Sequence, residues 1–219
     1  MRTRGVGLLV LGSLAAYLAA LPAFAKSPCD VASPSGPLFP AVKALKEGGK
    51  TLCDVGGQAS SCMKIDYQGK TLYCMVNYVR TKLGAFGVPC ELGAHDDGGY
   101  DKLYDTYSRV VWDAKKKTVR FAKIPAPGLT AYSSPKFCAD RIAYWSMEKT
   151  GGDNEVKAAV YDLTLKSVIK EEKVGTSPAT GDNFHTFPPP KWSESGNAVQ
   201  FQPPARGGGK LSGTTLELK

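Results

Sequence analysis

The chain has 219 residues, 42% of them hydrophobic, with 24 glycines, 15 prolines and 6 cysteines. This length and this hydrophobic content allow a sizeable core. They exclude a collagen-like or a low-hydrophobicity disordered chain, and they favour one domain with a small appendage. The 28 Lys and Arg residues outnumber the 20 Asp and Glu residues, so we expect weak attraction to anionic polymers.

The first 25 residues have the pattern of an export signal. Arg2 and Arg4 form a basic start, residues 6–21 are almost all apolar, and Pro22 precedes the small-x-small sequence of residues 23–25. We expect cleavage after Ala25, which leaves a soluble chain of formal charge +6 rather than +8, because two arginines leave with the signal. An uncleaved anchor is the alternative, but the run is shorter than the ~20 apolar residues that cross a bilayer comfortably. The expected location is the periplasm or the outside of the cell.

One short helix is expected before the chain becomes strand-like. Residues 26–40 are rich in Pro, Ser and Gly and predict an irregular arm. Residues 41–47 follow Pro40 and end at Gly48 and Gly49, which is typical of a helix start and stop. After Thr51, β-branched and aromatic runs alternate with Gly, Asp, Asn and Lys turns, so the rest of the chain is predicted to be mainly antiparallel β.

The most informative feature of the sequence is an internal repeat. Residues 112–119 (WDAKKKTV) align without a gap on residues 161–168 (YDLTLKSV). Both read aromatic, Asp, apolar, two free positions, Lys, hydroxyl, Val. We expect a strand that ends at the aromatic residue, a turn opened by an Asp that caps its own backbone, and a return strand that begins at the β-branched residue.

A second hairpin pattern occurs three times. Residues 65–74 align with residues 192–201, with Gly at the fifth position and apolar residues at the first, eighth and tenth. Residues 137–144 fit the same pattern with a turn two residues shorter. Three hairpins of this kind therefore alternate with two of the first kind, and the third copy breaks off at residues 215–218.

These residues resemble the blades of TolB-type and WD-like β-propellers. The best matches are residues 190–196 (PKWSESG) and 160–163 (VYDL), and the resemblance covers residues 62–219. It implies antiparallel blade-like sheets and a role in protein–protein contacts in the cell envelope. Two departures are Ser195, which stands where the family usually has Asp before Gly, and the count of about three blades where a closed ring needs at least four.

A missing blade would leave an open edge that templates strand pairing, so something must cover it. Residues 26–62 can pack there, a second copy of the chain can complete the ring, or the sheets can close as a β-sandwich. The sequence does not choose among the three. It divides the chain into a signal peptide (1–25), an arm with a short helix (26–61) and a blade-like β domain (62–219).

Six cysteines in an exported chain predict disulfides rather than a metal site. Their spacings form no zinc knuckle, and the only histidines, His95 and His185, are far apart in the sequence. A hairpin centred on Gln68 would place two of the cysteines directly opposite each other. Six cysteines allow fifteen pairings, and the sequence alone does not choose among them. The set that we hypothesise is Cys62–Cys74, Cys90–Cys138 and Cys29–Cys53, the last as a staple for the arm.

One loop is the candidate ligand site. Residues 95–101 carry His95, Asp96, Asp97 and Asp101 in a glycine-rich insertion. Such side chains can hold a hard cation such as Ca²⁺ through oxygen ligands. The register of a calcium-binding loop is missing and no bidentate Glu follows, so a solvated turn is the alternative.

Other patterns indicate structure rather than chemistry. Residues 115–117 are three lysines at a predicted hairpin tip, where we expect them to be solvated, and Glu171 and Glu172 should point to opposite faces of one strand. The aromatic residues expected in the core, rather than on a sugar-binding face, are Tyr144, Trp145, Phe184, Phe187 and Trp192. The sequence contains no serine nucleophile elbow, phosphate-binding loop, His-Glu-x-x-His helix or nucleic-acid recognition motif.

The sequence therefore predicts an exported, non-catalytic binding module of the cell envelope, with no cofactor. Its expected partner is an envelope protein or an anionic envelope polymer rather than nucleic acid, and a homo-oligomer is possible. The alternative is a hydrolase or lyase that acts on an envelope polymer through His95 and Asp97.

Overall fold

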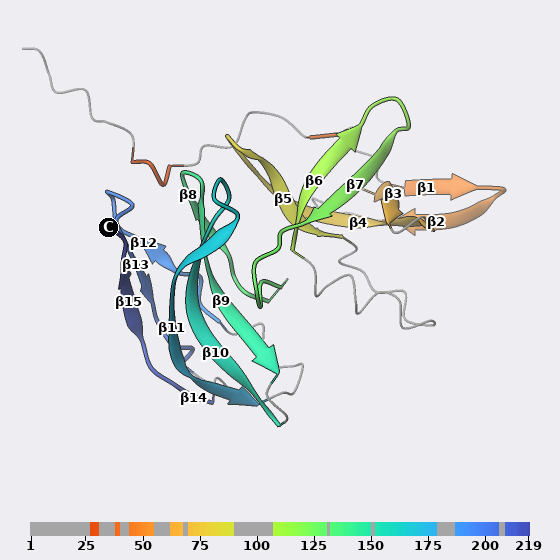
Figure 1. Ribbon diagram of the computed structural model, residues 1–219. Helices are drawn as coiled ribbons and strands as arrows, with labels where there is room; N and C mark the ends of the chain where they lie inside the picture. Colours follow the sequence, from red (N-terminus) through yellow and green to blue (C-terminus); the bar gives the residue numbers. More distant parts are fainter. Residues whose placement is uncertain are drawn as a thin grey trace, which may run out of the picture.

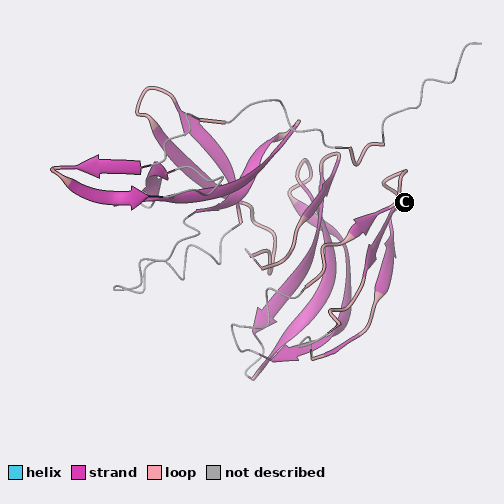
Figure 2. Ribbon diagram, turned by 180° about the vertical axis from the view of Figure 1, so that it is seen from behind, coloured by secondary structure: helices cyan, strands magenta, loops and turns pink. Residues whose placement is uncertain are grey.

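The computed structural model describes residues 27–30, 38–39, 44–54, 62–67, 70–89, 107–130, 132–149, 152–178, 187–205 and 209–219. Over these residues the chain is mainly β, and none of them is in a helix (Figure 2). The expected signal peptide lies outside the described residues. In the described part there is no helix with the length and apolarity needed to cross a membrane.

The first large unit is a five-stranded meander that closes on itself. Its strands, in both chain and spatial order, are β3 (Cys62–Tyr67), β4 (Lys70–Thr81), β5 (Gly84–Pro89), β6 (Ser108–Asp113) and β7 (Thr118–Lys123). Because successive strands are antiparallel, the fifth strand runs in the direction of the first, and β7 pairs with β3 in parallel. The buried interior of this barrel contains Phe39, Met63, Ile65, Ala85, Val110 and Val119.

The second and third units are open sheets (Figure 1). The second is an antiparallel meander in chain order of β8 (Lys136–Cys138), β9 (Arg141–Lys149), β10 (Asp153–Asp162) and β11 (Ser167–Pro178), with β14 (Lys210–Leu211) added beside β11. The third has the strand order β12 (Lys191–Trp192), β13 (Ala198–Phe201), β15 (Thr214–Glu217).

The second unit packs between the other two. Phe86 and Tyr107 of the barrel pack against Tyr161 and other side chains of the second unit. On the opposite face, Trp145 and Val160 of the second unit pack against the third. Neighbouring residues on one strand therefore serve different cores, because side chains alternate between the faces of a strand. Strand β10 is buried on both faces along much of its length.

The predicted internal repeat is confirmed at the level of the hairpin. Asp113 pairs with Thr118 in β6–β7, and Asp162 pairs with Ser167 in β10–β11, so the turns have equal length. Each Asp accepts two backbone N–H bonds within its own turn, at 3.0–3.1 Å for Asp113 and 2.8 Å for Asp162. The Lys at the sixth repeat position has a positive φ in both copies, 51° at Lys117 and 55° at Lys166.

The second hairpin pattern is also confirmed by the strand registers. Ile65 lies opposite Leu72 and Trp192 lies opposite Val199, which are the first and eighth positions of the aligned segments. In the shorter copy Phe137 lies opposite Ile142. The sheets around these hairpins differ, because the first copy belongs to the closed barrel and the other two belong to open sheets.

The predicted helix over residues 41–47 is wrong where the structure describes it. Residues Ala44–Glu47 form strand β1, which pairs with β2 (Lys50–Asp54). Gly48 and Gly49 have φ values of 56° and 78°. Two positive φ values in a two-residue loop are typical of a type I′ hairpin turn, so these glycines join two strands and do not end a helix.

The expected disulfide pairs also need correction. Cys29 is bonded to Cys138, which overturns both Cys90–Cys138 and Cys29–Cys53. Tyr67 pairs with Lys70, and this register places Met75 opposite Cys62 and Cys74 opposite Met63, which removes the geometric reason for Cys62–Cys74. Cys62 is itself disulfide-bonded, and its partner lies outside the described side chains.

The first described residues of the arm are fixed to the second and third units. Pro28 O accepts a hydrogen bond from Ala139 N at 2.9 Å, and Ser27 Oγ donates to Glu194 O at 2.7 Å. Gly196, in the β12–β13 turn, has a φ of 72°, and a Cβ atom there would lie 2.8 Å from Cys138 Sγ. Residues 27–30 thus join the β8–β9 turn to the β12–β13 turn, and the Cys29–Cys138 bond holds them there.

Candidate functional site

The predicted ligand loop, with His95, Asp96, Asp97 and Asp101, lies outside the described residues and stays a prediction. The described part contains no group of three or more His, Cys, Asp or Glu side chains that can hold a metal ion.

A cleft of about 330 Å³ lies at the junction of the barrel and the second unit. Its walls come from the β4–β5 turn, β5, β6, β7 and the segment after β7 on one side, and from the end of β10 and the β10–β11 turn on the other. The lining residues are Leu83, Phe86, Arg109, Ala122, Lys123, Ile124, Pro125, Tyr161, Leu163, Thr164 and Lys166. A concave site of this size between two packed sheets is typical of a ligand site.

The segment that joins the barrel to the second unit is hydrogen-bonded to β9. Strand β8 pairs with only the first part of β9, and beyond it the backbone N–H groups of Trp145 and Met147 donate to Ser133 O and Gly128 O at 3.0 and 3.4 Å. Pro127 O accepts from Tyr144 and Ser146 hydroxyls at 3.0 and 3.1 Å. The connecting segment thus protects the edge of β9.

The charges of the described lining residues all have one sign. Arg109 comes from β6, Lys123 from β7 and Lys166 from the β10–β11 turn, and no carboxylate is among the described lining side chains. The Arg109 guanidinium donates to Leu83 O and lies 6.0 Å from the centroid of the Phe86 ring, so it is held in one place. This arrangement favours an anionic ligand.

Tyr161 also lines the cleft, and its hydroxyl is buried. Its side chain is 1% exposed, and its hydroxyl has no hydrogen-bond partner. Burial raises the pKa of Tyr161, and the neighbouring Asp162 carboxylate raises it further, so the hydroxyl keeps its proton. Among the buried side-chain polar atoms without a partner in the described part, this hydroxyl is the one that belongs to a residue of the cleft.

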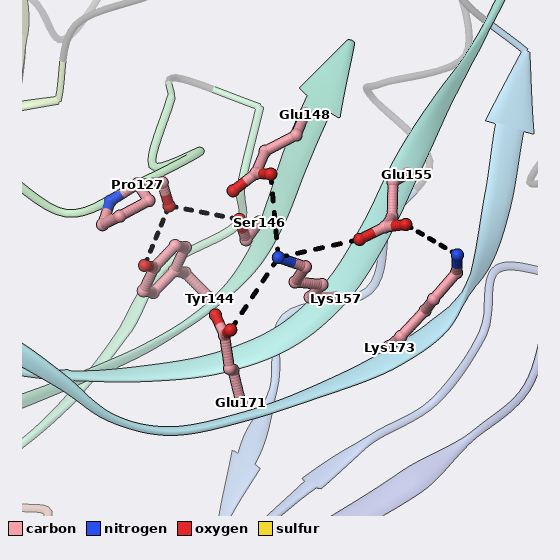
Figure 3. A network of polar contacts seen from close by, with 8 residues as sticks. All are labelled: Pro127, Tyr144, Ser146, Glu148, Glu155, Lys157, Glu171 and Lys173. Carbon is pink, nitrogen blue, oxygen red and sulfur yellow. Dashed lines mark hydrogen bonds and ion pairs between the residues drawn. The ribbon is translucent and has the colours of Figure 1, made fainter. Parts of the chain in front are cut away.

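A network of ion pairs occupies the same face of the second unit farther along the strands (Figure 3). Lys157 Nζ lies 3.6 Å from the carboxylates of Glu148 and Glu155 and 3.8 Å from that of Glu171. Glu155 also contacts Lys173 Nζ at 2.6 Å. Burial acts to lower the pKa of Lys157, but the carboxylates of Glu148, Glu171 and Glu155 outweigh it and raise the pKa. Lys157 therefore stays charged and is unsuited to act as a base or nucleophile.

Glu171 faces Lys157, whereas Glu172 accepts a hydrogen bond from Thr214 Oγ1 at 3.0 Å, so the two do not form an acid–base pair. Residues 115–117 are exposed at a hairpin tip, as predicted. Tyr144, Trp145 and Phe187 are core residues, Trp192 is partly buried, and Phe184 lies outside the described residues.

Sequence reasoning missed the cleft. Tyr161 and Lys166 were identified as parts of the repeated hairpin, but no pattern connects them with Arg109 or Lys123. The chain matches no protein-family model, and it matches neither a curated protein nor a solved structure.

Proposed function

We propose that the chain is an exported, non-catalytic binding module of the cell envelope that holds an anionic partner in the cleft between the barrel and the second unit. The observation that carries this proposal is the composition of the cleft. Three cationic side chains from three separate elements converge on it without a described carboxylate among them. Rigid strands position two of the three, which limits the reorganisation that binding requires.

Two further observations support the proposal. The Cys29–Cys138 disulfide is compatible with an oxidising compartment, where exported proteins reside. The second unit is a four-stranded meander in chain order and packs against a neighbour on each face, which is how consecutive propeller blades pack. The relation to TolB-type propellers remains part of the proposal, and the first unit departs from it because that unit closes into a barrel.

The test compares two triple variants that remove the same charge. One carries Arg109→Gln, Lys123→Gln and Lys166→Gln in the cleft, and the other replaces all three lysines of residues 115–117 with Gln. Each is immobilised and exposed to an envelope extract at low and high salt.

The cleft variant should lose at least about tenfold in captured partner at low salt, since each rim charge is typically worth up to about 1 kcal/mol. The hairpin-tip variant should retain the wild-type level. Equal loss in both variants would show that capture reflects only the basic charge of the whole chain, and the proposal would then be wrong.

A further inference from the structure

We infer that the ligand of the cleft is a carboxylate carried on an apolar peptide segment of a partner protein. This inference rests on the proposed function and names its ligand class. Three observations support it: the apolar walls, the converging cations and the unpartnered hydroxyl of Tyr161.

The walls favour a peptide over a sugar polymer. Apart from the three cations, the described lining consists of apolar side chains, chiefly Leu83, Ile124, Pro125 and Leu163, together with Thr164 and Tyr161. A sugar unit carries several hydroxyl groups that would need partners, and these walls offer few. A volume of about 330 Å³ has room for one or two side chains of a partner.

The cations favour a carboxylate held by Arg109. A guanidinium presents two parallel N–H donors that match the two oxygens of a carboxylate. The contacts of Arg109 with Leu83 O and the Phe86 ring orient its side chain before a ligand arrives. Lys123, from β7, and Lys166, from the β10–β11 turn, line the same cleft and add two further positive charges.

Tyr161 supplies a donor that the protein leaves unused. Tyr144, on the same face of the same sheet, donates its hydroxyl to Pro127 O at 3.0 Å, whereas the hydroxyl of Tyr161 has no acceptor. A buried donor gains most when its first partner is charged. A carboxylate oxygen that enters the cleft would provide that partner, and the two tyrosines form a matched pair for the test.

The experiment titrates the ¹⁵N-labelled chain, beginning after Ala25, with three probes while backbone amide signals are followed by NMR. The probes are acetyl-Leu-Asp-Leu-amide, its isosteric control acetyl-Leu-Asn-Leu-amide, and trigalacturonic acid. The first peptide should shift signals of the β10–β11 turn and of Lys123 in a saturable way, with at least about tenfold higher affinity than the second. Tyr161→Phe should weaken binding of the first peptide about tenfold, the factor that one hydrogen bond to a charged group supplies. Tyr144→Phe should leave the affinity unchanged.

Each other outcome counts against the inference. Equal affinity for the Asp and Asn peptides, or an unchanged affinity in Tyr161→Phe, would show that no carboxylate reaches the hydroxyl. Binding of trigalacturonic acid without the peptide would replace the peptide by an acidic sugar and leave the proposed function intact. If none of the probes binds, the ligand class is wrong; in that case the capture experiment with the two triple variants decides whether the proposed function fails as well.

Discussion

Removal of the Cys29–Cys138 bond should cost a large part of the stability of this chain. The bond joins residues 109 positions apart. In the chain-entropy description, a loop of ~100 residues corresponds to about 4.7 kcal/mol at 25 °C. Cys62 is also disulfide-bonded, and the remaining cysteines, Cys53, Cys74 and Cys90, all lie inside this loop. The inner bond shortens the effective loop, but halving a loop changes the value by only about 0.6 kcal/mol.

We therefore expect the double variant Cys29→Ala/Cys138→Ala to lose about 4 kcal/mol in the free energy of unfolding. The measurement is urea denaturation without reductant, monitored by intrinsic fluorescence. The midpoint of the unfolding transition and its slope are both compared with those of the wild type. Ser27→Ala is the matched control, because it keeps the disulfide and removes only the two hydrogen bonds of Ser27 Oγ, which donates to Glu194 O and accepts from Cys29 N. It should lose no more than about 2 kcal/mol. A loss below about 1 kcal/mol in the double variant would refute the view that this bond fixes the arm.

Three further predictions concern single residues. Asp162→Ala should reduce the free energy of unfolding by about 1 kcal/mol, because two N–H groups of its turn lose their acceptor. Asp113→Ala should have a smaller effect, because the hydrogen bonds in its turn are exposed. Equal losses of unfolding free energy for the two variants in urea denaturation would contradict this prediction. Gly175→Ala should detach β14 from β11, because Gly175 has a φ of 142° and a Cβ atom there would lie 1.9 Å from Lys210 O. The expected result is faster amide hydrogen exchange at residues 210–211. Unchanged exchange at these residues would contradict the prediction. The pKa of Glu155 lies below its ordinary value, chiefly because its carboxylate is hydrogen-bonded to Lys173. Its contribution to stability is therefore present above the unfolded pKa near 4.5 and is lost as the pH falls through the lower folded pKa. Glu155→Gln should flatten the fall of the unfolding free energy below pH 4.5, and an unchanged slope would show that the ion pair does not contribute.

The hairpins could be predicted from the sequence because their determinants are local. An Asp that accepts N–H bonds within its own turn, such as Asp113 or Asp162, needs no distant partner. The helix prediction failed for the opposite reason. Gly48 and Gly49 suit a helix end as well as a hairpin turn, and pairing with β2 selected the hairpin. A slip of one residue in the β3–β4 register was enough to remove the geometric reason for Cys62–Cys74.

The candidate site could not be predicted because its residues come from separate parts of the chain. The described lining extends from Leu83 to Lys166 and belongs to two units that meet only through tertiary packing. Nothing in the local pattern distinguishes Lys123 or Lys166 from a solvated lysine. Tyr161 occupies the aromatic position of the repeat, and only the structure shows that its hydroxyl has no partner.

The central claim is that a partner binds in the cleft, and the repeat itself supplies the control for testing it in cells. A photo-crosslinking amino acid is placed at Thr164, which lines the cleft, and separately at Lys115, which holds the same position in the other copy of the turn. Irradiation of cells that express the chain should give a discrete adduct from position 164 that is absent from position 115. Adducts of equal yield at both positions, or an adduct from position 115 alone, would contradict the account.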